Sequence, residues 1–128
     1  MKKILLILII VLELSIIKIP KYTELNDLAI IEEIFIEQNN HKYTIVLKEI
    51  IPKKADQGIN YEYKYYQDTS TTINKTINKI SHKTKKKLYL NKTKSLITNI
   101  KITDKITNDL NIKPATIIHT NNVLDKIN

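Results

Sequence analysis

The sequence has no cysteine, no tryptophan and no arginine, and Gly58 is the only glycine among 128 residues. Without cysteine, disulfides, thiolate metal sites and lipidation through a cysteine are excluded. One glycine is too few for a glycine-rich loop that wraps a phosphate. No G-x-S-x-G pattern marks a serine nucleophile. We therefore expect a protein that is not an enzyme, with no catalytic, cofactor-binding or metal-binding residues.

The charge is strongly positive, with a formal net value of +8. Such a value raises the possibility of nucleic-acid binding. However, all 21 basic residues are lysine, whereas arginine is expected for bidentate contacts to phosphate or guanine. The 26 Ile, 21 Lys and 13 Asn residues have AT-rich codons, so a low-GC bacterial genome accounts for the lysine excess. We expect no specific nucleic-acid binding; a basic cytosolic nucleic-acid-binding protein is the alternative function.

Residues 1–20 are predicted to be a signal or anchor segment. Lys2 and Lys3 precede an apolar run of nine residues, Ile4–Leu12, which has the length of a signal-peptide core and is short of the roughly 20 residues of a spanning helix. No small-x-small cleavage site follows. An uncleaved anchor, a cleaved signal peptide and a buried cytosolic element remain open. An anchor would place the following domain on the extracytoplasmic face, because lysines that precede an anchor, here Lys2 and Lys3, favour the cytoplasmic side of the membrane.

Residues 21–128 are predicted to form one small α+β domain. Two apolar runs, Leu28–Glu37 and Lys42–Ile51, predict strands joined as an antiparallel hairpin. One face of the first strand is expected to carry Leu28, Ile30, Ile34 and Ile36. One face of the second strand is expected to carry Tyr43, Ile45, Leu47 and Ile51.

A polar loop is predicted over Pro52–Asn60, followed by a third, partly exposed strand over Tyr61–Tyr66. The tyrosines of this strand, with Lys64 among them, resemble a base-stacking surface. An amphipathic strand with half-buried tyrosines is the preferred interpretation.

The remaining sequence predicts two helices, two strands and a short last helix. Asp68–Ser70 offers N-caps for a helix with Ile73, Ile77 and Ile80 on one face, ending near His82. Ile102, Ile106 and Leu110 mark a second helix behind Thr103-Asp104, with Asn111 at its C-terminal end. Strands are expected over Leu88–Thr98 and Ala115–His119, and a short helix from Asn121. The expected fold is a mixed or antiparallel sheet of about five strands with two to three helices, behind an N-terminal hydrophobic helix.

Two groups of titratable residues are candidates for chemistry. His41, His82 and His119 are too far apart in sequence for a recognised zinc motif, so we interpret them as surface residues. Glu32, Glu33 and Glu37 contain a possible acid/base pair. Because neighbours on a strand point to opposite faces, Glu32 and Glu33 are expected to lie apart, as solvated carboxylates.

The stretch Glu24-Leu25-Asn26-Asp27-Leu28-Ala29, directly behind the apolar N-terminus, resembles the opening of the mature part of the Ger(x)C family, the C subunits of bacterial germinant receptors. Further similar segments are Tyr43–Pro52, Thr71–Ile73 and Lys87–Leu90. The resemblance covers roughly residues 22–127. The sequence departs from the family in lacking a lipobox cysteine, in having Lys92 where a histidine is usual, and in lacking the long additional C-terminal part.

The resemblance implies a non-enzymatic, membrane-tethered accessory subunit that acts in nutrient-triggered spore germination. Its location would be outside the spore inner membrane, against integral-membrane receptor subunits. Glu24, Asn26 and Asp27 have two interpretations, a cap at the start of the first strand or a contact surface for those subunits. A nonfunctional truncated paralogue is a further alternative, and no small-molecule ligand is indicated.

Overall fold

A computed structural model describes residues 2–16 and 27–127 of the chain. The elements in chain order are α1 (Lys2–Ile16), β1 (Leu28–Asn39), β2 (Lys42–Ala55), β3 (Gly58–Ser70), α2 (Ile73–Thr84), β4 (Lys87–Tyr89), β5 (Ser95–Thr98), α3 (Asp104–Leu110), β6 (Thr116–His119) and a final 3-10 turn, η2 (Leu124–Lys126).

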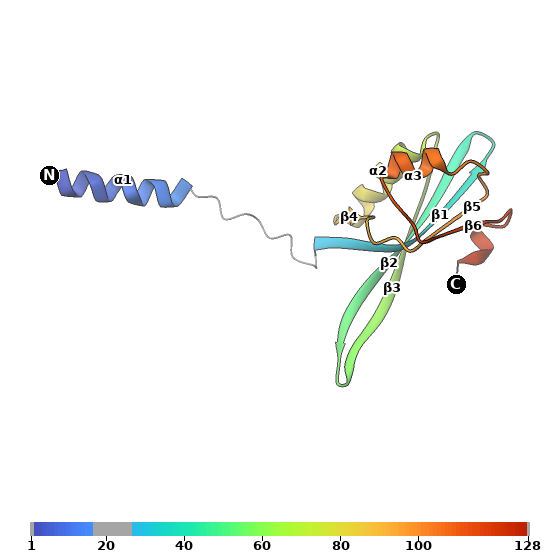
Figure 1. The fold of residues 1–128 in the computed structure, drawn as a ribbon, viewed down its shortest axis with the longest axis horizontal. Helices are drawn as coiled ribbons and strands as arrows, with labels where there is room; N and C mark the ends of the chain where they lie inside the picture. Colours follow the sequence, from blue (N-terminus) through green and yellow to red (C-terminus); the bar gives the residue numbers. More distant parts are fainter. Residues whose placement is uncertain (1, 17–26, 128) are drawn as a thin grey trace.

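The strands form one mixed, six-stranded sheet in the order β3-β2-β1-β5-β6, with β4 also paired to β1 (Figure 1). β1, β2 and β3 are antiparallel neighbours, whereas β4 and β5 lie parallel to β1, and β6 lies parallel to β5. The α+β class and the mixed sheet are as predicted. The sheet has one strand more than expected, because the predicted strand Leu88–Thr98 is interrupted at residues 90–94 and forms both β4 and β5.

The main core lies between the sheet and the helices α2 and α3. Ile34, Ile36, Ile45 and Leu47 of β1 and β2 are fully buried here and pack against Ile73 and Ile80 of α2 and against Ile106 and Leu110 of α3. On the opposite face of the sheet, a smaller cluster contains Phe35, Val46, Ile97 and Val123, with Ile127 packed against it. The C-terminal residues therefore cover the middle of this second face.

Two tight turns connect the first three strands. Asn40 and His41 both have positive φ, at 50° and 64°, which is the type I′ geometry of a two-residue hairpin. The second turn, Asp56–Gln57, is followed by Gly58 at φ 97°, so a side chain here would be strained. The prediction of a loop over Pro52–Asn60 was wrong. The strands β2 and β3 extend through these residues and are paired from Pro52↔Tyr61 to Ala55↔Gly58.

A β-bulge in β1 changes which of its residues face the core. Ile31 pairs with Glu49 and Glu33 pairs with Lys48, so Glu32 is an extra residue. An extra residue reverses the alternation of side chains along a strand. Ala29 and Ile31 before the bulge, and Ile34 and Ile36 after it, therefore all join the main core. The prediction that Leu28 and Ile30 share the face of Ile34 and Ile36 was wrong for this reason.

The start of α2 differs from the predicted one, whereas α3 begins at Asp104 behind Thr103, as predicted. β3 continues to Ser70, and Thr72 rather than Asp68–Ser70 caps α2, accepting a hydrogen bond of 3.1 Å from the Lys75 backbone N–H. Ile102 lies ahead of α3 and is 74% exposed. Asn111 ends α3 in the left-handed conformation, as predicted, because asparagine tolerates positive φ.

The N-terminal helix α1 contains 15 residues. Its side chains from Ile4 to Val11 are each 48–67% exposed. No helix within the described residues has both the length and the apolar character that crossing a bilayer requires.

Candidate functional site

The bulge in β1 brings Glu32 and Glu33 together on one face of the sheet, beside Lys48 of the neighbouring strand β2. The Lys48 ammonium lies 3.8 Å from a Glu32 oxygen and 3.6 Å from a Glu33 oxygen. It also lies 4.2 Å from the centre of the Tyr63 ring, within cation–π range. The expectation that the two carboxylates point to opposite faces was wrong, because the extra residue cancels the alternation. They form an ion-paired cluster instead.

A second carboxylate cluster lies on the helix side of the sheet. Glu49 is only 1% exposed. One of its oxygens accepts a hydrogen bond of 2.7 Å from the Tyr66 hydroxyl, and the other lies 3.0 Å from the Lys86 ammonium. A buried charge needs such partners, because removal from water is otherwise costly. Burial, and then the hydrogen bond to Glu49 and its negative charge, raise the pKa of Tyr66 well above its usual value. The hydroxyl therefore keeps its proton and remains a donor.

β1 and β2 separate just beyond this cluster. Ile31 is paired with β2, whereas Leu28–Ile30 pair with β4 on the other edge of β1. The separation leaves a cleft of ≈140 Å³ lined by Leu28, Ile30, Glu49, Ile50, Ile51, Pro52 and Lys86. Sequence reasoning missed Glu49 and Lys86. The available signal was Glu49 itself, which interrupts the apolar alternation from Ile45 and Leu47 to Ile51.

Past this cleft, β2 and β3 continue as a two-stranded arm, here defined as residues 50–63. Figure 1 shows the arm projecting from the sheet, away from α2 and α3. Six residues of each strand are paired in it, which gives a length of about 20 Å at the usual rise of a strand. Pro52 has no backbone N–H and is typical of strand edges, so it suits an arm whose outer edge has no third strand.

The two faces of the arm differ in chemistry. One face carries Ile59, Tyr61 and Tyr63, which are 61%, 55% and 47% exposed. Their cross-strand partners on that face are Lys54, Pro52 and Ile50. The opposite face contains an ion pair of 2.8 Å between Lys53 and Glu62. The arm is therefore an amphipathic ribbon, and its two tyrosines are about half buried, as predicted.

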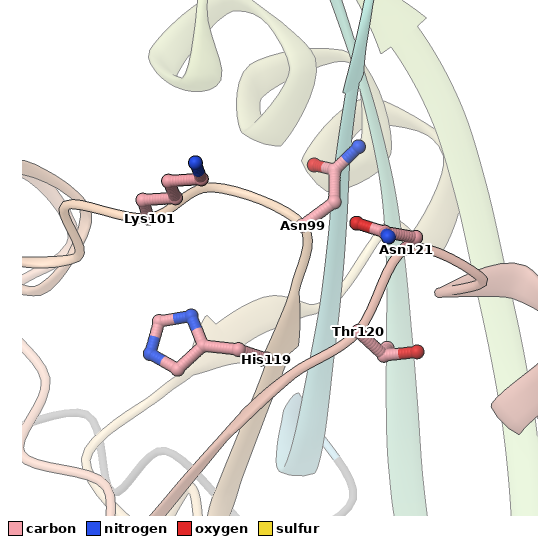
Figure 2. A pocket seen from close by; sticks show the side chains of 5 residues that line it. All are labelled: Asn99, Lys101, His119, Thr120 and Asn121. Carbon is pink, nitrogen blue, oxygen red and sulfur yellow. The ribbon is translucent and has the colours of Figure 1, made fainter.

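A separate polar depression of ≈340 Å³ lies where β5 and β6 end (Figure 2). It is lined by Asn99, Lys101, His119, Thr120 and Asn121. The Asn99 side chain is already used, since its amide exchanges two hydrogen bonds of 2.8 and 2.9 Å with the backbone of Gln38. This pair of hydrogen bonds connects the end of β5 to β1. The depression itself is open and shallow.

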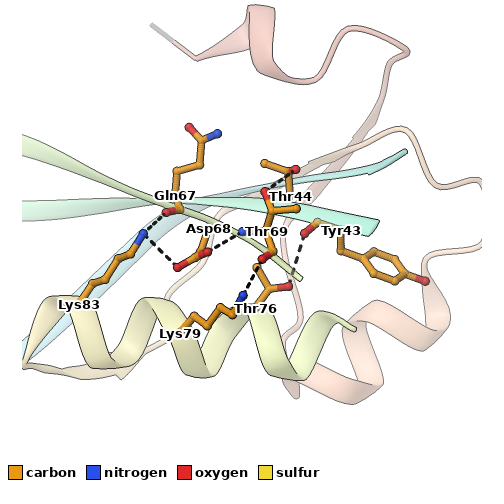
Figure 3. A network of polar contacts seen from close by, with 8 residues as sticks. All are labelled: Tyr43, Thr44, Gln67, Asp68, Thr69, Thr76, Lys79 and Lys83. Atoms are coloured by element: carbon orange, nitrogen blue, oxygen red, sulfur yellow. Dashed lines mark hydrogen bonds and ion pairs between the residues drawn. The ribbon is translucent and has the colours of Figure 1, made fainter. Parts of the chain in front are cut away.

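A network of polar contacts fixes α2 on β3 (Figure 3). Lys83 pairs with Asp68 at 3.0 Å and donates to the Gln67 carbonyl at 2.9 Å, while Lys79 donates to the Thr69 carbonyl at 3.0 Å. The hydrogen bond to Lys83, and next the backbone N–H of Thr69, hold the pKa of Asp68 below its usual range. The lysines of α2 thus hold the helix against the end of β3.

Replacing Asp68 by asparagine is expected to lower the free energy of unfolding at neutral pH by about 0.2–1 kcal/mol, the usual value of an exposed ion pair. A carboxylate whose pKa is lowered by folding adds stability above its unfolded pKa and loses it as the pH falls. The difference from the parent protein should therefore begin to shrink below about pH 4 and disappear once the pH has fallen past the lowered pKa of the folded state. Urea unfolding of both proteins at pH 7 and pH 3 measures it, and an equal difference at both pH values would contradict the expectation.

The residues singled out from the sequence are distributed over the molecule. Asp27 is exposed immediately before β1, whereas Glu24 and Asn26 lie outside the described residues. His41 is in the β1–β2 turn, His82 on α2 and His119 in β6, and all three are exposed, as expected for surface histidines.

Comparison with known proteins identifies the domain. The family model described as the spore germination protein N-terminal domain matches residues 21–111, from the segment before β1 to the end of α3. No curated protein and no solved structure matches the chain. The match covers well over half of the sequence and confirms the resemblance that the opening motif indicates. The chain belongs to the spore germination protein N-terminal domain family, and its role lies in spore germination.

Proposed function

We propose that this chain is a non-enzymatic accessory subunit in nutrient-triggered germination, tethered through α1 to the spore inner membrane. Its α+β domain would lie on the extracytoplasmic face, against integral-membrane subunits of the germinant receptor. Membership of the germination family supports the general role. The tether and the accessory role are supported by features of α1 and of the domain.

The observation that carries the tether is the run of eight consecutive exposed apolar side chains from Ile4 to Val11 in α1. Eight residues are more than two turns, so the apolar surface surrounds the helix. A helix that is apolar on all sides belongs in a protein core or a membrane. At 1.5 Å per residue α1 is about 22 Å long, and a bilayer core is about 30 Å thick. In the sequence, Ile17 and Ile19 follow α1, with Lys18 between them.

A binding role without catalysis is supported by the carboxylates of the domain. Glu32 and Glu33 are paired with Lys48, and Glu49 is held between Tyr66 and Lys86. These carboxylates are thus used to hold strands and a lysine in place. A contact surface for receptor subunits at Glu24, Asn26 and Asp27 remains part of the proposal, and the exposure of Asp27 is compatible with it.

Replacing Ile7 and Ile9 together by lysine tests the tether. Each lysine near the centre of an inserted helix costs about 2.5–3.5 kcal/mol on insertion scales. The I7K/I9K variant is therefore expected to move from the membrane pellet to the soluble fraction when host membranes are sedimented.

A matched control carries the same two changes outside α1. Ile102 and Ile118 are 74% and 42% exposed in the domain, so the I102K/I118K variant adds the same charge without touching α1. It should remain in the membrane pellet together with co-purifying receptor subunits. Retention of the I7K/I9K variant in the pellet would show that α1 alone does not hold the chain on the membrane.

A further inference from the structure

We propose that the apolar face of the arm, formed by Ile59, Tyr61, Tyr63 and their partners, lies on the surface of a bilayer that contains anionic phospholipid. The arm would be a second membrane contact beside α1. The inference rests on the proposed function in one respect, that α1 brings the domain to a membrane.

The side chains of this face suit the boundary between lipid headgroups and acyl chains. Tyrosine is enriched there because its ring is apolar and its hydroxyl is polar. Exposure rises toward the turn, from 39% at Tyr65 through 47% at Tyr63 and 55% at Tyr61 to 61% at Ile59. Lys54, opposite Ile59, has a long apolar stem whose ammonium can reach the headgroups. An amphipathic element of this composition lies flat in the interface.

Lysines gather at the same end of the sheet. Lys87 pairs with Leu28, so the basic run from Lys85 to Lys87 leads from the end of α2 into β4, beside the first residues of β1. Lys85 and Lys87 are exposed. Each lysine close to an anionic bilayer adds about 1 kcal/mol of attraction. The charge at this end therefore favours anionic lipid over an uncharged apolar partner.

The direction of the chain brings this end toward the membrane. β1 begins at the end of the sheet from which the arm projects, because β1 and β2 are antiparallel and separate at Ile31 and Glu49. Ten residues, 17–26, connect α1 with Asp27, and ten residues span at most about 35 Å. The arm is about 20 Å long. A helix held in the bilayer thus keeps the base of the arm within reach of the lipid surface.

The absence of tryptophan from the chain permits a direct test with single-tryptophan variants of the full chain. In Y61W the indole is placed on the apolar face of the arm, and in the matched control N60W it is placed one residue away, on the charged face. Both positions are exposed, so both variants should keep the fold and the tether. Vesicles of phosphatidylcholine and phosphatidylglycerol, with bromine on the acyl chains, quench an indole that lies at the boundary.

The expected result is a blue shift and a loss of roughly half of the indole emission for Y61W, because interfacial elements bury their apolar face about 5–10 Å deep. N60W should keep nearly all of its emission. Vesicles of phosphatidylcholine alone should quench Y61W less, because the lysines at this end then lose their anionic partner.

Other outcomes separate this inference from the proposed tether. A Y61W chain that sediments with vesicles but is quenched no more than N60W overturns the arm contact and leaves the tether standing. A blue shift that needs no lipid and grows with protein concentration assigns the face to a second copy of the chain and overturns the inference. Quenching of Y61W that persists with I7K/I9K shows that the arm reaches lipid without α1, and it supports the arm contact independently of the tether.

Discussion

Replacing Lys86 by methionine is expected to lower the free energy of unfolding by about 2–3 kcal/mol. Removing one partner of a buried ion pair typically costs about 3–5 kcal/mol, because the remaining charge is left in an apolar environment. The Lys86 side chain is 33% exposed whereas Glu49 is 1% exposed, so water compensates part of the loss and the expected cost is reduced. Urea unfolding at neutral pH measures the change.

The double variant E49Q/K86M is the matched control. Glutamine keeps the shape of Glu49 and can still accept the hydrogen bond of Tyr66, but it has no charge that requires the lysine. It should recover at least half of the stability lost in K86M, which gives a clear interaction energy in a double-mutant cycle. Equal instability of the single and double variants would show that Lys86 acts through its packing rather than through its charge.

Replacing Ile31 by alanine is expected to destabilise the domain by about 2–5 kcal/mol, the usual cost of removing a buried isoleucine side chain. Ile31 is fully buried on the core side of the bulge. The same change at its neighbour Ile30, which lines the cleft beside the arm, should cost about 1 kcal/mol or less, as is usual away from the core. Thermal or urea unfolding of I31A and I30A compares the two positions.

This pair of variants also distinguishes the bulged strand from a regular one. In a strand without a bulge, Ile30 would share the core face with Ile34 and Ile36, and I30A would be the more damaging change. A larger loss for I30A than for I31A would therefore contradict the observed register. Circular dichroism of both proteins before unfolding would show whether each retains the native secondary structure.

Local chemistry explains the parts of the fold that the sequence predicted. The strands on either side of Asn40–His41, the apolar face of α2 and the end of α3 at Asn111 depend on residues close together in the chain. Asparagine tolerates positive φ, and a helix with Ile73, Ile77 and Ile80 must bury that face. The opening motif similarly indicated the germination family, which the family match confirmed.

Contacts between distant segments explain the parts that the sequence did not predict. The bulge at Glu32 is compensated by residues about 60 positions away: the Thr93 hydroxyl donates to the Ile31 carbonyl, and the Lys94 N–H donates to the Glu32 carbonyl at 2.8 Å. The polar residues from Pro52 to Asn60 predict a loop, but cross-strand pairing extends the strands through them. Glu49 and Lys86 become a site only when β2 and the residues just before β4 are brought together.

The topology of the sheet also implies an order of assembly. β1, β2 and β3 are consecutive and joined by two-residue turns, so their pairing closes only short loops. The pairing of β1 with β5 joins Glu33 to Ser95, and long loop closures slow folding. As the domain folds, the second edge of β1 thus remains open until residues 87–98 are available to pair with it. An open strand edge of this kind is prone to pair with other chains, so the domain is most exposed to aggregation before β4 and β5 have docked.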